Sequence, residues 1–221
     1  MKTINNFFCD YPIYYINLDR SKDRRKYIEG IAEKYSISNV NRISAIDGKK
    51  IKRSDYYIRG YSMFTNSELA CLLSHIEAIR TSYYNNDPYS IIMEDDTGFG
   101  LLSNINYNIK DIIDNAPSNW EYINLCPLNP LIKFSATKYI PIKRLNGLGA
   151  STYIINRKGM KKILDTLLPD DKIKIDANIC KTDSLYSDVI IPLLLNTYSY
   201  RDEIFYQNKT FPKEIEFSYA L

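Results

Sequence analysis

The stretch Ile91-Ile92-Met93-Glu94-Asp95-Asp96 places three apolar residues directly before three carboxylates. A short apolar run bounded by polar residues predicts a buried strand that carries its acidic tip to the open end of a sheet. Because alternate residues of a strand share a side, we expect Glu94 and Asp96 to face one way and Asp95 the other. Three adjacent negative charges repel one another, so a cation or a hydrogen-bond network must neutralise them.

The acidic tip admits two interpretations. Two carboxylates from one strand end, with coordination positions left for water and phosphate, suit Mn²⁺ or Mg²⁺ rather than zinc. In the alternative, the strand simply ends in an acidic turn that Gly98 and Gly100 help to bend. These residues alone leave both interpretations open.

An earlier strand is predicted over residues 12–17, followed by the polar turn Asn17-Leu18-Asp19-Arg20. Ser21 can cap a helix that runs to about Lys34, because apolar residues recur there at helical spacing. A strand, a short turn and a helix N-terminus offer backbone N–H groups and a positive dipole end to an anion. The basic residues of this turn support that interpretation, although a solvated basic helix face is the ordinary alternative.

The strongest helix signal lies between the two strands. Thr65 or Asn66 can cap it, Glu68 lies in its first turn, and leucines and isoleucines form a core-facing stripe as far as Ile79. His75, the only histidine of the chain, lies at the edge of this stripe. A histidine in such a place is more often a hydrogen-bonded packing residue, and as a metal ligand it would need partners, which the carboxylates of 94–96 could supply.

The rest of the chain continues to alternate strands and helices. We expect strands over 120–126, 138–143 and 150–156, a helix capped by Asn156, either a helix or a strand over 184–196, and a surface tail over 197–221. This order predicts a single α/β domain over residues 1–221, with a mostly parallel sheet flanked by helices. Functional groups should then gather at the carboxyl ends of the strands.

Composition narrows the class of protein. A hydrophobic content of 45%, a charged content of 25% and a net charge of +3 are those of a soluble globular chain and give no argument for nucleic acid. The four cysteines form no C-x-x-C pair, which disfavours zinc and a disulfide framework. Residues 1–10 lack the apolar core of a signal peptide, and no apolar run is long enough for a membrane helix. We therefore expect a cytoplasmic protein without a transmembrane segment.

Four motifs in order carry a family resemblance: YYINLDRSKDRR at 14–25, SELACLLSH at 67–75, IIMEDD at 91–96 and LGASTYIINRKGMKKIL at 148–164. Together they resemble glycosyltransferase family 25, which includes lipooligosaccharide galactosyltransferases and collagen galactosyltransferase-like proteins. The resemblance covers roughly residues 12–180. It implies a GT-A-like fold and transfer of a hexose from a UDP-sugar with inversion, with galactose expected before glucose.

The resemblance also implies roles for individual residues. It places the nucleotide sugar against Asn17, Leu18, Asp19, Arg20, Arg24, His75 and Glu94. Glu94 and Asp96 resemble the two acidic positions that hold Mn²⁺ (or Mg²⁺) on the diphosphate. Asp176 resembles the late Ile-Asp position, and we hypothesise that it is the general base, with Asp95 and Asp188 as competitors and a turn or helix-cap role as the alternative.

The resemblance implies that the acceptor is a hydroxyl of a glycan or of a hydroxylated side chain. We expect neither the secretion signal nor the second catalytic domain of longer family members, and this expectation places a collagen acceptor in doubt. A compact transferase suits lipopolysaccharide or other surface-glycan assembly at the cytoplasmic face of a bacterial membrane, or a virus that encodes its own glycosylation. Two alternatives are a catalytically degenerate glycan- or partner-binding module and a nucleotidyltransferase, which would release pyrophosphate.

Overall fold

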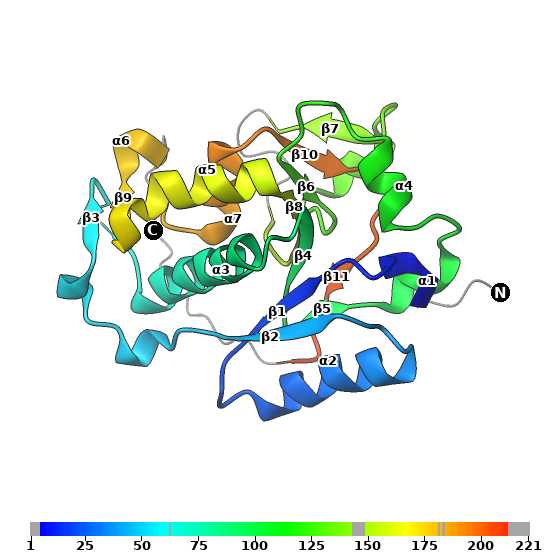
Figure 1. Cartoon of the computed structure of the whole chain (residues 1–221), viewed down its shortest axis with the longest axis horizontal. Helices are drawn as coiled ribbons and strands as arrows, with labels where there is room; N and C mark the ends of the chain where they lie inside the picture. The colour runs from blue at the N-terminus through cyan, green and yellow to red at the C-terminus, as the bar shows by residue number, and fades with distance from the viewer. Residues whose placement is uncertain (1–4, 62, 143–148, 181, 183, 212–221) are drawn as a thin grey trace.

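The computed structural model describes residues 5–61, 63–142, 149–180, 182 and 184–211. Its central sheet has seven strands: β1 Ile13–Asn17, β2 Val40–Ser44, β4 Tyr89–Glu94, β6 Tyr122–Asn124, β7 Tyr139–Pro141, β8 Thr152–Asn156 and β10 Thr197–Tyr200. Their order across the sheet is β2-β1-β4-β8-β6-β10-β7 (Figure 1). The predicted α/β class is confirmed.

The sheet is mixed in its pairings. β1 pairs in parallel with β2 and β4, and β10 pairs in parallel with β6. β8 lies antiparallel between β4 and β6, and β7 is antiparallel to β10. Most strands therefore run in one direction, as predicted. The pairings between neighbouring strands are nevertheless half parallel and half antiparallel. The apolar pattern cannot reveal this, because a buried strand shows the same run of residues in either direction.

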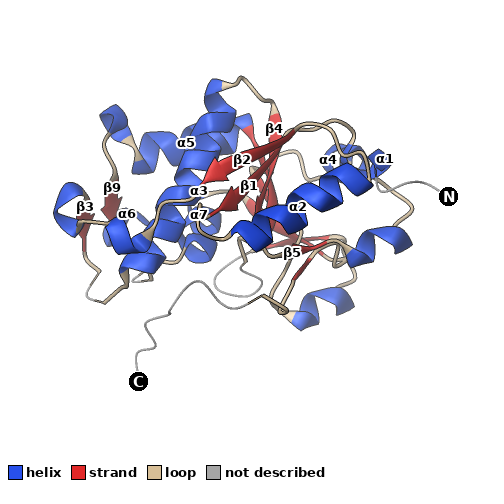
Figure 2. Ribbon diagram, turned by 90° about the horizontal axis from the view of Figure 1, so that it is seen from below, coloured by secondary structure: helices blue, strands red, loops and turns tan. Residues whose placement is uncertain are grey.

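Helices cover both faces of the sheet (Figures 1 and 2). One face packs against α3 Asn66–Tyr84, α5 Arg157–Leu167 and α7 Ser187–Leu194, and the other against α1 Asn5–Phe8, α2 Lys22–Lys34 and α4 Ile109–Asp114. Alternate strand residues divide between the two cores: Tyr14 and Ile92 belong to the first, and Tyr15 and Ile91 to the second. None of the described helices is long and apolar enough to span a membrane.

The starts of two helices follow their predicted caps. Thr65 Oγ1 accepts a hydrogen bond from Glu68 N at 3.1 Å, and Glu68 accepts one from Thr65 N at 2.6 Å, which completes a capping box. Asn156 accepts from Gly159 N at 2.8 Å at the start of α5. The capping box fixes where α3 begins. The start of α3 in turn sets the positions of the side chains on that helix that face the cavity.

The C-terminal segment corrects the prediction of a surface tail over 197–221. β10 lies inside the sheet, and Phe205 is fully buried. β11 Tyr206–Gln207 then pairs with β5 Thr97–Gly98, directly after the acidic stretch. Residues 212–221 lie outside the described part of the chain, as do residue 143 of the strand predicted over 138–143 and residue 148 of the last family motif. Within the undecided segment 184–196, the structure forms helix α7.

Helix α5 approaches the sheet closely at Gly159, where an added Cβ would lie 2.6 Å from the carbonyl oxygen of Glu121. We expect Gly159→Ala to lower the free energy of unfolding by about 1–3 kcal/mol, because the helix must move away from the strand. Gly30 in α2 is the matched control, because nothing lies within 4 Å of its added Cβ. Gly30→Ala should stabilise the chain by about 0.5–1 kcal/mol through helix propensity. Urea unfolding of both variants checks the pair, and equal effects would contradict the close packing.

Candidate functional site

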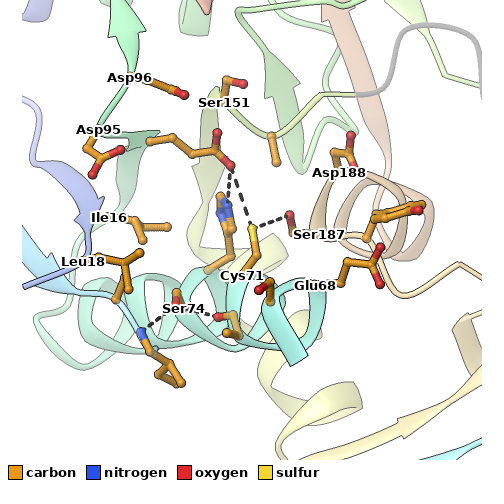
Figure 3. A pocket seen from close by; sticks show the side chains of 18 of the residues that line it. Ile16, Leu18, Glu68, Cys71, Ser74, Asp95, Asp96, Ser151, Ser187 and Asp188 are labelled. Carbon is orange, nitrogen blue, oxygen red and sulfur yellow. Dashed lines mark hydrogen bonds and ion pairs between the residues drawn. The ribbon is translucent and has the colours of Figure 1, made fainter. Parts of the chain in front are cut away.

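A cavity of about 240 Å³ lies where β1 and β4 end (Figure 3). Its walls come from the turn after β1, the first half of α3, the end of β4, the residues before β8, the start of α7 and strand β11. The polar side chains that line it are Arg20, Arg24, Ser67, Glu68, Cys71, Ser74, His75, Glu94, Asp95, Asp96, Ser151, Tyr186, Ser187, Asp188 and Gln207.

The acidic tip is divided between a strand and a turn. β4 ends at Glu94, and Asp95 and Asp96 lie in the turn that leads to β5. Asn208 N donates to the carbonyl of Asp96 at 2.7 Å, which fixes this turn against the C-terminal segment. The expectation that the alternation of a strand continues through Asp96 is therefore wrong. Both aspartates contact Arg24, whereas Glu94 contacts His75.

Arg24, on the first turns of α2, is buried against the two aspartates. Its Nη1 donates to Asp95 Oδ1 at 2.8 Å and lies 3.3 Å from Asp96 Oδ2. Asn17 donates to the other oxygen of Asp95 at 2.7 Å. Burial raises the pKa of Asp95, although Arg24 and Asn17 oppose the shift. Both oxygens of Asp95 are therefore engaged, one by Arg24 and the other by Asn17.

Glu94 is the carboxylate that meets the histidine. His75 is fully buried, with Nδ1 at 3.1 Å from the Tyr153 hydroxyl and Nε2 at 3.4 Å from Glu94 Oε1. Cys71, one helical turn earlier, places Sγ 4.0 Å from the same glutamate oxygen. Of the three carboxylates proposed as partners for the histidine, the structure therefore places Glu94 beside it.

Asp96 and Asp188 are among the carboxylates that share the cavity with Glu94. Burial, with the charge of Glu94 as the next cause, raises the pKa of Asp96 and that of Asp188 to about 6 each. Asp96 Oδ1 is buried and has no hydrogen-bond partner among the described residues. Mn²⁺ and Mg²⁺ prefer oxygen ligands such as carboxylates. A bound cation would also offset the repulsion between these carboxylates. The residues present therefore fit the predicted cation.

The predicted nucleotide-binding residues divide into two groups. Leu18, Arg20 and Arg24 line the cavity, as do His75 and Glu94. Asn17 and Asp19 are not among the lining residues. The buried Asn17 side chain bonds to Asp95, and the exposed Asp19 side chain accepts from Arg42 at 2.6 Å and Ser44 at 2.8 Å.

The structure does not bring Asp176 to the cavity. It ends β9 Lys174–Asp176, which pairs with β3 Tyr57–Arg59 in a separate small sheet. Its Oδ1 accepts from Asn178 N at 2.9 Å, at the start of α6 Ala177–Cys180. This contact matches the helix-cap alternative. Asp188, named as a competitor for the base, does line the cavity.

Sequence reasoning missed Cys71, Ser187 and Gln207 as cavity residues. The spacing of four between Cys71 and His75 on one helix was a usable signal, because residues at that spacing share a face. Gln207 Nε2 lies 3.4 Å from Asp96 Oδ2. Nothing in the sequence around Gln207 indicates that the C-terminal segment returns to the acidic tip.

Three solved structures resemble this fold. One is a glycosyltransferase involved in the glycosylation of the major capsid of PBCV-1, with 10% sequence identity, coverage of 72% of this chain and 67% of that chain, and a TM-score of 0.42. Another is mouse xyloside xylosyltransferase 1 in its apo form, with 10% identity, coverage of 87% and 73%, and a TM-score of 0.36. A third is a nucleoside-diphosphate-sugar pyrophosphorylase from Vibrio cholerae RC9, with 9% identity, coverage of 87% and 73%, and a TM-score of 0.41. No curated protein sequence matches the chain.

The family comparison is more specific. The model of glycosyltransferase family 25, described as LPS biosynthesis protein, matches residues 10–179, which is more than half of the chain. Its range agrees with the resemblance over 12–180 and includes the cavity residues from Ile16 to Ser151. This match supports glycosyltransferase activity and shows that the chain belongs to glycosyltransferase family 25.

Proposed function

We propose that this chain transfers a hexose, galactose before glucose, from a UDP-sugar to a hydroxyl of a glycan or of a hydroxylated side chain, with inversion and with a divalent cation. The observation that carries the proposal is one cavity in which the basic turn after β1 faces Glu94, Asp96 and Asp188. A sugar nucleotide needs positive groups for its diphosphate, a cation to bridge to carboxylates, and a base for the acceptor.

The donor side is formed by the turn after β1. Leu18 and Arg20 line the cavity, and the Arg20 guanidinium pairs with Asp47 while 39% of its side chain stays exposed. A guanidinium in this setting can bind phosphate oxygens with two parallel hydrogen bonds. Arg24 acts differently, because its buried charge holds Asp95 and Asp96 in place.

Glu94 and Asp96 are the proposed ligands of Mn²⁺ or Mg²⁺. Asp96 offers the oxygen that has no donor, and Glu94 is close enough for its charge to raise the pKa of Asp96. When bound, such a cation stabilises the negative charge that develops on the leaving UDP.

We assign the general base to Asp188 in place of Asp176. Asp188 lies in the first turn of α7 and lines the cavity, and its pKa of about 6 lets it be ionised yet basic near neutral pH. It takes the proton of the acceptor hydroxyl while the acceptor oxygen bonds to the anomeric carbon. The bond from that carbon to UDP breaks on the opposite face, which inverts the anomeric configuration.

Ligand-induced stabilisation tests the donor site. We expect UDP with Mn²⁺ to stabilise the chain by about 2.7 kcal/mol at a ligand concentration one hundred times Kd, measured as a rise in Tm. Asp96→Asn should lose the Mn²⁺-dependent part of this rise. Asp165→Asn is the matched control, because Asp165 is exposed and pairs with Lys161 on the surface of α5. No rise with the native chain would favour the glycan- or partner-binding alternative.

A further inference from the structure

Three different ligand atoms meet on the α3 side of the cavity (Figure 3). Cys71 Sγ, a ring nitrogen of His75 and a carboxylate oxygen of Glu94 all lie within 4.8 Å of one another. Cys71 and His75 are four residues apart on α3, so one helix face presents both, and β4 supplies the glutamate. The cysteine spacing disfavours zinc, because the four cysteines form no C-x-x-C pair, but a site with a single cysteine needs no such pair.

The separations are close to those of a tetrahedral site. With zinc at about 2.0 Å from nitrogen and oxygen and about 2.3 Å from sulfur, tetrahedral geometry separates nitrogen and oxygen by about 3.3 Å and sulfur and oxygen by about 3.5 Å. The structure has 3.4 Å between His75 Nε2 and Glu94 Oε1, and 4.0 Å between Cys71 Sγ and the same oxygen. The sulfur–oxygen pair would have to close by about half an ångström to reach this geometry. The sulfur and a ring nitrogen of His75 lie within 4.8 Å of each other.

The surroundings favour the form of histidine that binds metals. Tyr153 Oη lies 3.1 Å from His75 Nδ1, and the two rings stack with centroids 5.8 Å apart. When Nδ1 carries the proton and donates to this hydroxyl, the lone pair of Nε2 points towards Glu94. Ser187 Oγ lies 3.3 Å from Cys71 Sγ and can donate to a thiolate. Outer partners of this kind orient and stabilise metal ligands.

We propose that Cys71, His75 and Glu94 bind a thiophilic divalent cation of the Zn²⁺ class, with the fourth position open to the cavity. On binding, the Cys71 thiol releases its proton to solvent and its sulfur bonds to the metal. This site differs in ligand chemistry from the proposed Mn²⁺ site of Glu94 and Asp96, because a thiolate and an imidazole select softer cations. The two sites share Glu94, so a zinc-class ion here takes that ligand from the other cation.

Cobalt absorption tests the site without sugar nucleotide or acceptor, so the outcome is independent of the proposed transfer. Co²⁺ is added to the full chain in a phosphine reductant, and the thiolate-to-cobalt charge-transfer band is followed. We expect one cobalt per chain, displacement by Zn²⁺, loss of the band in Cys71→Ser, and an unchanged band in Cys9→Ser. Cys9 is the control because its thiol donates to the carbonyl oxygen of Phe7, and both residues are distant in sequence from the cluster.

Tyr153→Phe provides a variant that keeps the ring stack and removes only the hydroxyl. We expect its cobalt affinity to fall by about 10–100-fold, the usual cost of losing an outer partner of a ligating histidine. If Cys71→Ser does not fold, this change in affinity decides the matter. Absence of the band in the native chain, its persistence in folded Cys71→Ser, or an unchanged affinity in Tyr153→Phe would overturn the proposal and leave a hydrogen-bonded cluster.

Discussion

Asp188→Asn is expected to lower kcat for hexose transfer by about 10²- to 10⁴-fold, the range over which general bases contribute. The carboxylate lines the cavity at the start of α7 and has a pKa of about 6. Asparagine keeps the shape of the side chain but cannot accept the proton of the acceptor hydroxyl. Steady-state transfer by the native chain and the variant, with donor, acceptor and Mn²⁺ at saturation, measures the difference.

Asp176→Asn is the matched control for this experiment. Asparagine retains the oxygen that accepts from Asn178 N, so the cap of α6 should survive and transfer should stay within a few-fold of native. The opposite pattern, with transfer lost in Asp176→Asn and intact in Asp188→Asn, would contradict the assignment made from the cavity. It would restore the assignment made from the family resemblance.

The folding stability of Asp188→Asn should show whether its lower kcat comes from loss of the base or from loss of the fold. Burial and the charge of Glu94 raise the pKa of Asp188 from 3.8 to about 6. Between these two values the native state binds more protons than the unfolded state, so the contribution of Asp188 to the free energy of unfolding falls as pH rises. Asp188→Asn removes this penalty and should stabilise the chain, in chelator, by about 1–3 kcal/mol at pH 8. Urea unfolding of the native chain and of Asp188→Asn, at pH 5 and at pH 8, measures the sign of this change in the free energy of unfolding.

Arg24→Met is expected to lower the free energy of unfolding by about 3–5 kcal/mol, the usual cost of removing one partner of a buried ion pair. The variant keeps an apolar stem of similar length but leaves Asp95 and Asp96 without their shared cation, and each of these carboxylates is less than one-tenth exposed. Chemical denaturation measures the loss. Adding Asp95→Asn to Arg24→Met should recover part of it, because one uncompensated charge is then gone.

Arg25→Met is the neighbouring control on the same helix. Arg25 pairs with Glu29 one turn away, and both side chains are about half exposed, at 49% and 47%. Such an exposed pair contributes about 0.3–0.5 kcal/mol. Equal effects of Arg24→Met and Arg25→Met would show that the buried network around the acidic tip does not stabilise the fold.

Local signals in the sequence predicted the elements that build the site. The apolar run before Glu94 became β4, and Thr65 and Asn156 cap the helices whose starts they marked. These features depend on neighbouring residues, which is why a single sequence reveals them. The sequence offered the carboxylates of 94–96 as partners that His75 would need as a metal ligand, but it did not distinguish Glu94, which contacts the histidine, from its two neighbours.

Features that depend on distant segments were not predictable in the same way. β10 enters the sheet beside β6, and Gln207 reaches Asp96, because the chain returns from far along the sequence. Asp95 leaves the strand because a turn begins there, held by the C-terminal segment. Asp176 and Asp188 look equally suitable as isolated aspartates, and only the packing of α7 on the cavity separates them.

UDP release from a panel of UDP-sugars, with Mn²⁺ or with chelator, tests the central claim most directly. The native chain should release UDP from one hexose donor, UDP-galactose first, only when the metal is present, and Asp96→Asn should lose this turnover while remaining folded. Release that is unchanged by chelator and by Asp96→Asn would contradict the cation site. No release from any sugar nucleotide, or pyrophosphate release from a nucleoside triphosphate instead, would contradict the proposed hexosyl transfer.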